Sequence, residues 1–114
     1  MARTGEIDPK LWPEIRGLIL RYIYRQERKK KEVVFLRAWA FVHDEGYKIT
    51  PEDLATALAD MSEVGYISFK KEENARTGEV RHQNIRTTQK GRNLVEETGK
   101  DPSIRIDILR EADE

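Results

Sequence analysis

The sequence contains no cysteine and only two histidines among its 114 residues. Without cysteine the chain can form no disulfide framework, no thiolate metal site and no cysteine nucleophile. No apolar run approaches the ~18 residues that are needed to span a bilayer. The first segment, MARTGEIDPK, lacks the apolar core of a signal peptide. These absences predict a cytoplasmic protein with no membrane partner.

The formal net charge is zero, but the charges are unevenly distributed. Residues 15–37 carry eight Lys or Arg against two Glu, and residues 43–64 carry one Lys against six acids. Residues 70–92 carry seven bases against three acids, and residues 93–114 carry three against seven. Alternating blocks of this kind predict basic and acidic surfaces on one small body, with a uniformly solvated charged exterior as the alternative.

Motifs for catalysis are lacking as well. The sequence has no Gly-rich phosphate loop, no set of Ser, His and acid, and no metal-ligand spacing. Its one run of potential ligands is His43, Asp44 and Glu45, and consecutive side chains on a helix point in different directions. We therefore predict that the protein is not an enzyme and has no catalytic residue, no metal site and no cofactor.

Two segments in the first half have the pattern of helices. From Trp12 to about Lys29 apolar residues recur at the spacing of one helical stripe, and Pro13 suits the first turn. The segment VVFLRAWAFV, residues 33–42, is apolar nearly all round, and Gly46 suits the position after a helix end. This segment predicts the most enclosed helix of the fold, with a buried strand as the alternative for so short a run.

The segment ITPEDLATALADMSEVGYISF, residues 49–69, predicts a helix followed by a strand. Thr50, Pro51 and Asp53 supply an N-cap hydroxyl, a Pro in the first turn and a carboxylate in the capping-box position, so the helix is expected over 51–64. Its buried face should comprise Leu54, Ala57, Leu58, Met61 and Val64. The segment contains no Arg, Lys, Asn or Gln, so the exposed surface of this helix should be acidic or small.

The next segments predict a hairpin and a last helix. The segment YISFK alternates apolar and polar residues as a strand does, and VRHQNIRT has the pattern of a second, returning strand. Between them KEENARTGEV supplies turn residues, so residues 66–87 should form a β-hairpin. A helix should start near Thr87 or Thr88 and stop at Gly99. Within it, Arg92 is either a weaker candidate for DNA contact, like Arg86, or a partner of Glu96 four residues on. SIRIDIL predicts an added edge strand, and READE a frayed end.

These elements predict a single domain that is mainly α with a small antiparallel β-hairpin (α+β). The domain should span residues 1–99, with its first helix as an N-terminal extension. Residues 100–114 should form a C-terminal arm that contains a short strand and a disordered end.

The order helix, helix, capped helix, hairpin and closing helix resembles the winged-helix family of helix-turn-helix domains, from about Val33 to Glu97. The resemblance is in particular to small regulators of the MarR or PadR type. ITPEDLATALADMSEVGYISF resembles the family's recognition helix and the entry to its wing. TTQKGRNLVEE resembles the Thr-x-x-Gly-Arg-x-Leu segment that follows the second strand of the wing.

The resemblance implies a dimer that binds duplex DNA, with the capped helix in the major groove and the wing along the minor groove or the phosphates. We expect a transcriptional regulator that forms a homodimer through its first helix and tail. Clustered Lys and Arg beside a Gly turn can reach successive phosphates. The implied wing contacts are Lys70, Lys71, Arg76, Arg81 and His82. Weaker candidates on the helices and their ends are Arg28, Lys29, Lys30, Lys31, Arg37 and Thr56.

The capped helix departs from this pattern, because base readout needs donors such as Arg, Asn or Gln. One hypothesis is weak or shape-based DNA specificity, with the affinity supplied by the basic wing. The alternative is a winged-helix module that binds a basic protein partner through the acidic helix. The residues for that contact would be Asp53, Asp60 and Glu63.

Overall fold

The computed structural model describes residues 8–96 and residue 104 of the chain. The elements follow in the order η1 (Pro9–Leu11), α1 (Trp12–Arg28), α2 (Phe35–Asp44), α3 (Pro51–Glu63), β1 (Ile67–Glu73), β2 (Val80–Thr87) and α4 (Gln89–Glu96). Four α-helices and one two-stranded antiparallel sheet make up this described part. The predicted class, mainly α with a β-hairpin, is confirmed.

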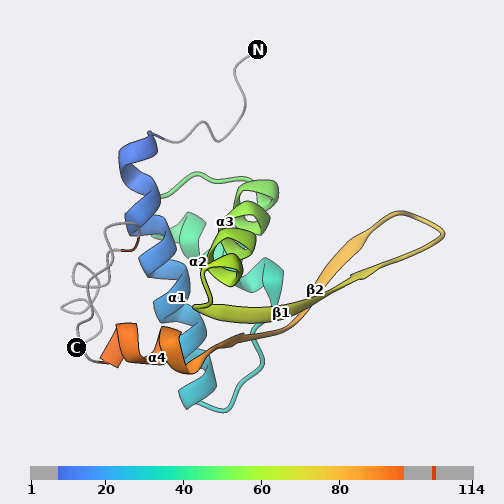
Figure 1. The fold of residues 1–114 in the computed structure, drawn as a ribbon. Helices are drawn as coiled ribbons and strands as arrows, with labels where there is room; N and C mark the ends of the chain where they lie inside the picture. The colour runs from blue at the N-terminus through green and yellow to red at the C-terminus, as the bar shows by residue number, and fades with distance from the viewer. Residues whose placement is uncertain (1–7, 97–103, 105–114) are drawn as a thin grey trace.

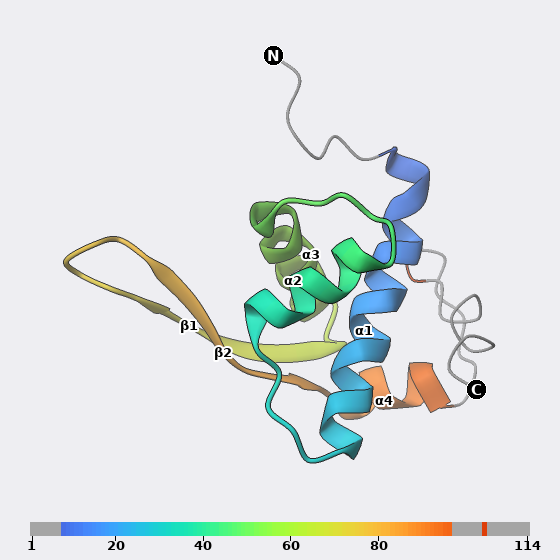
Figure 2. The same ribbon diagram turned by 180° about the vertical axis from the view of Figure 1, so that it is seen from behind.

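α1 is the central helix of the molecule. α2 and α3 lie on one side of it, α4 lies beside its C-terminal half, and the hairpin projects away from the helices (Figure 1). The reverse view shows the same arrangement with α2 in front (Figure 2). The buried residues of α1 are Ile15, Gly17, Leu18, Ile19, Leu20, Ile23 and Tyr24. Burial of this apolar stripe is the main contribution of α1 to the stability of the core.

The prediction that residues 33–42 form the most enclosed helix is wrong, although the helix itself is present. Only Ala38 and Val42 of α2 are buried, and Leu36 is 61% exposed. α1 occupies the centre instead, because its longer stripe contacts α2, the hairpin and α4. The other apolar side chains of α2 are covered only in part: Phe35, Trp39 and Phe41 pack against the edge of the core, whereas Leu36 is exposed.

α3 begins as its sequence predicts. The Thr50 hydroxyl accepts the Asp53 backbone N–H at 3.1 Å, and the Asp53 carboxylate accepts the Thr50 backbone N–H at 2.9 Å. This reciprocal pair is a capping box. The expected buried face is confirmed except at Val64, which is 49% exposed because the helix ends before it and Gly65 turns the chain with a φ of +92°.

The two strands pair in a register that contains a β-bulge. Ser68 pairs with Arg86, yet Lys70 pairs with Gln83, so β2 has one residue more than β1 between these pairs. Asn84 in this stretch has a φ of +54°, a left-handed conformation that Asn adopts more readily than most residues. Because of this extra residue, the side chains of β2 beyond the bulge point to the opposite faces from those that strict alternation would give.

The bulge gives the hairpin two faces of different character. The inner face packs against α2 and the core through Ile67, Phe69, Ile85 and, beyond the bulge, His82. Paired residues share a face, so the opposite side, here called the outer face, comprises Ser68, Lys70, Glu72, Arg81, Gln83 and Arg86. All six are exposed.

α4 is docked on the turn between α3 and β1. The Thr88 hydroxyl accepts the Gly91 N–H at 3.1 Å, so Thr88 caps the helix as predicted. The Lys90 Nζ donates to the Val64 carbonyl oxygen at 2.8 Å and lies 4.8 Å from the centre of the Tyr66 ring. These contacts hold the first turn of α4 directly against the backbone of residues 64–66.

Arg92 and Glu96, offered as a pair by their spacing, have other partners. The Arg92 guanidinium donates to the Thr87 carbonyl oxygen at 3.1 Å and to the Gln89 side chain at 3.2 Å, because the start of α4 lies within its reach. Glu96 accepts the Tyr24 hydroxyl of α1 instead. The end of α4 is thereby tied to the central helix.

The predicted end of the last helix at Gly99 lies outside the described residues, and so does the C-terminal arm with its predicted strand, apart from Ile104. Ile104 is described, and it is 4% exposed and belongs to the hydrophobic core.

Candidate nucleic-acid interface

The predicted wing contacts lie on the hairpin, which extends well beyond the helical body (Figures 1 and 2). Every residue from Lys71 to Arg81 is exposed. The outer face carries the cations Lys70, Arg81 and Arg86, and Arg76 adds a fourth in the connecting loop. The structure therefore brings three of the five predicted wing residues to one continuous surface.

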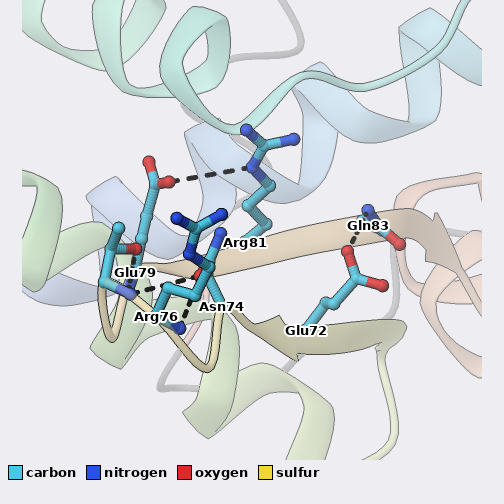
Figure 3. Close-up of polar contacts among 7 residues, drawn as sticks. Glu72, Asn74, Arg76, Glu79, Arg81 and Gln83 are labelled. Carbon is cyan, nitrogen blue, oxygen red and sulfur yellow. Dashed lines mark hydrogen bonds and ion pairs between the residues drawn. The ribbon is translucent and has the colours of Figure 1, made fainter.

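The loop at the tip is organised by Asn74. Its side-chain oxygen accepts the backbone N–H groups of Arg76 at 2.8 Å (Figure 3) and of Thr77 at 3.1 Å. The Asn74 carbonyl oxygen accepts the Gly78 N–H at 2.7 Å. Gly78 has a φ of +76°, which favours glycine. The loop thus holds the backbone at Arg76 in place while its guanidinium extends into solvent.

The acids of the hairpin leave most of its cations without a partner. Arg81 lies 4.0 Å from Glu79, an exposed pair of the kind that contributes little to stability, and Glu72 accepts the Gln83 amide at 3.3 Å (Figure 3). Among the described residues, no carboxylate forms an ion pair with Lys70 or Arg76. These cations are available to an external anion.

His82 is a packing residue rather than an exposed contact. Its ring stacks on Phe35 of α2, with centroids 4.6 Å apart, and meets Phe69 of β1 at 5.2 Å. The bulge places it there, because simple alternation from Ile85 would have pointed it outward. Burial, together with the nearby Lys71 ammonium, lowers the pKa of the His82 imidazole below its ordinary value of 6.5.

This pKa predicts a loss of stability on acidification. Between the pKa of the folded protein and 6.5, the unfolded chain binds more protons at His82, so the free energy of unfolding falls as the pH drops below 6.5. The loss is complete once the pH is below the folded pKa. The substitution His82→Phe keeps an aromatic ring between Phe35 and Phe69 and should flatten this part of the profile.

The profile is measured as urea unfolding midpoints between about pH 8 and about pH 5. Lys71→Gln should shrink the same loss by removing the cation beside the ring. An unchanged profile in His82→Phe would show that another group is responsible.

The basic run that follows α1 lies beside β2. Arg28 donates to the Tyr24 hydroxyl at 3.4 Å, and Lys29, Lys30 and Lys31 are exposed. Glu27, one turn back, accepts both the backbone N–H and the hydroxyl of Thr87 in β2. The sequence had no signal for this link between α1 and β2, which brings the run close to Arg86.

The remaining candidates on the helices are less suited to base contact. Arg37 is exposed on α2. The Thr56 hydroxyl of α3 donates to the Glu52 carbonyl oxygen one turn back at 3.1 Å, so its proton is engaged within the helix. α3 therefore presents no available hydrogen-bond donor at this position.

The exposed surface of α3 is acidic, as expected, but through a different set of residues. Glu52, Asp60 and Glu63 are exposed, and Asp60 pairs with Arg16 of α1 at 3.6 Å. Asp53 does not belong to this surface because it is 7% exposed and caps its own helix. The helix α3 adjoins β1, whereas the segment with the basic run adjoins β2, so these two segments lie at opposite edges of the hairpin (Figures 1 and 2).

Within residues 8–96 and 104, no helix has the length and apolar character of a membrane span, and no three or more His, Asp or Glu side chains are grouped as a metal site requires. Comparisons of the chain with protein-family models, with curated proteins and with solved structures found no match.

Proposed function

We propose that the protein is a winged-helix DNA-binding regulator that holds duplex DNA through the outer face and tip of its hairpin. The observation that carries this proposal is the projecting hairpin with Lys70, Arg76 and Arg86 available on one surface. The order of elements and the Thr88 cap at the start of α4 support the winged-helix resemblance.

The chemistry of this surface favours the phosphate backbone over base edges. Flexible Lys and Arg side chains on a strand pair can reach successive phosphates, and each contact releases a counterion from the duplex. The Thr56 hydroxyl of α3 is engaged within the helix, and α3 carries no Arg, Lys, Asn or Gln for the edges of the bases. We therefore propose weak or shape-based sequence preference.

The experiment is a titration of a labelled duplex of arbitrary sequence from low to physiological salt. The double substitution Lys70→Ala with Arg76→Ala should weaken binding similarly for all sequences. Loss of two phosphate contacts should reduce the salt slope by about 2. Fluorescence anisotropy gives both the affinity and its salt dependence.

A matched control removes two exposed lysines away from the hairpin, Lys10 in η1 and Lys48 in the α2–α3 connection. This variant has the same net charge as the hairpin variant and should bind within about twofold of the parent. Equal weakening by the two pairs would mean that net charge, rather than the hairpin, determines binding.

A second candidate function rests on α3. Its exposed acids Glu52, Asp60 and Glu63 are suited to a basic protein surface, so a protein-interaction module is the alternative proposal. A homodimer is also proposed from the family resemblance. Because the apolar stripe of α1 is already buried within the chain, such a dimer would need another apolar surface, and the exposed Leu36 of α2 is one available contact.

A further inference from the structure

A cleft of about 490 Å³ lies between the C-terminal end of α1 and the free edge of β2. Lys30 and Lys31 approach it from the segment after α1, and Asn84 and Arg86 line it from β2. None of the three cations forms an ion pair with a described residue. The cleft thus combines three positive charges and an amide in one concave site.

Lys30 adopts a conformation that is costly for lysine. Its φ is +58°, and it occupies the C′ position of a Schellman motif at the end of α1. In this motif the Lys30 N–H donates to the Glu27 carbonyl oxygen at 2.9 Å, and the Lys31 N–H donates to the Gln26 carbonyl oxygen at 2.9 Å. Glycine is the usual residue there because it has no Cβ to clash. The chain therefore has lysine at a position where glycine would be more stable.

Compensation of the helix dipole does not explain this choice. A positive charge near the last turn of α1 is favourable, but Arg25 and Arg28 within that turn already supply it. Neither of them needs a left-handed backbone. Strain that the fold alone does not require is characteristic of functional sites.

The second non-glycine residue with a positive φ among the described residues lines the same cleft. Asn84 has a φ of +54° at the β-bulge. The bulge lies between Gln83 and Arg86, and Arg86 belongs both to the cleft and to the outer face. The cleft is therefore continuous with the cationic surface of the hairpin, at the edge remote from the acidic α3.

Two carboxylates also line the cleft and oppose an anion. Glu27 is engaged by the backbone N–H and hydroxyl of Thr87, which occupy its oxygens. Glu32 is exposed and has no such partner among the described residues. Removing the Glu32 charge should therefore strengthen anion binding. A cleft with no ligand would show no such gain in affinity.

We propose that this cleft is a phosphate-binding site in which Lys30, Lys31 and Arg86 hold one phosphate group. The inference rests on the proposed function in taking the DNA backbone as the source of that phosphate. In this arrangement the strongest contact with the DNA backbone is made at the β2 edge, so α3 need not enter the major groove. A small phosphorylated compound offers the same chemistry, and the experiment separates the two sources.

The test uses Lys30→Gly in the full chain. This substitution removes one charge from the cleft and relieves the left-handed strain, so the thermal unfolding midpoint should rise by a few degrees. Affinity for an arbitrary labelled duplex at about 0.1 M salt should fall roughly five- to tenfold, the loss of one phosphate contact. Glu32→Gln should tighten the same binding.

Lys10→Ala is the matched control, since it removes one exposed lysine at the opposite end of α1 and should change affinity less than about twofold. Duplex binding by Lys30→Gly equal to that of the parent would overturn the proposal, because the variant is at least as well folded.

The second part of the experiment titrates inorganic pyrophosphate into the protein and monitors the NMR chemical shifts of the backbone amides. If the parent fails to bind duplex, the proposed function fails. Pyrophosphate shifts at Asn84 and Arg86 that vanish in Lys30→Gly would then still support the cleft as a site for a small phosphorylated ligand. Absence of both duplex binding and these shifts would reject the phosphate site as well.

Discussion

Gly91→Ala is expected to lower the free energy of unfolding by about 3 kcal/mol, the upper end of the range for overpacked substitutions. A Cβ at this position would lie 2.1 Å from the Tyr66 carbonyl oxygen and 3.1 Å from its carbonyl carbon. Helix propensity alone predicts the opposite sign, because alanine is favoured over glycine by about 1 kcal/mol inside a helix. The direction of the change therefore distinguishes the two effects.

The backbone at Tyr66 has little freedom to move away. Its N–H donates to the Met61 carbonyl at 2.9 Å, and its carbonyl accepts the Thr88 N–H at 3.0 Å. The Thr88 hydroxyl also donates to the carbonyl of Gly65. Relief of the clash at Gly91 would have to displace α4 and break part of this network.

The measurement is urea unfolding followed by circular dichroism, with Gln89→Ala as the control. Gln89 is exposed in the same helix, so its replacement should change the free energy of unfolding by less than about 0.5 kcal/mol. Stability of Gly91→Ala equal to or above that of the parent would contradict the close packing of α4 on the turn.

Reversing two acids of α3, Asp60→Lys with Glu63→Lys, is expected to raise affinity for duplex DNA about tenfold or more at ~0.1 M salt if the protein binds DNA. The change adds four units of charge to a surface that now repels phosphate. Asp60 is half exposed and its pair with Arg16 is 3.6 Å long, so its loss should cost less than about 1 kcal/mol of stability. Duplex affinity is measured by anisotropy as a function of salt.

The matched control reverses two exposed acids elsewhere, Asp44→Lys with Glu45→Lys at the end of α2. It has the same net charge, so equal tightening by both variants would show only a general electrostatic effect. For a protein-interaction module the outcome differs. The α3 reversal should then abolish binding of a basic partner and leave duplex affinity no higher than in the control.

Local signals in the sequence were sufficient for the helix starts and the hairpin. Thr50 and Asp53 form the predicted capping box, and Thr88 caps α4, because these interactions span only three residues. The same capping box removes Asp53 from the exposed acidic surface. Asp53 was predicted both to cap the helix and to contact a partner, and its burial is compatible only with the cap.

Tertiary contacts decided the rest. α2 is the more apolar segment, yet α1 is central, because enclosure depends on how many elements surround a helix and not on its composition. The bulge at Asn84 turns His82 inward and Arg81 outward, which strict alternation would have reversed. The Glu27–Thr87 contact joins residues 60 positions apart, and no local pattern reports it.

By itself, the sequence determined the element types, the alternating charge blocks and the absence of cysteine chemistry, because these depend on composition and on spacing within a few residues. Only the tertiary structure decided which charges share a surface. It placed Lys30 and Arg86 at one cleft and set α3 at the other edge of the hairpin, since those distances depend on packing between segments far apart in the chain.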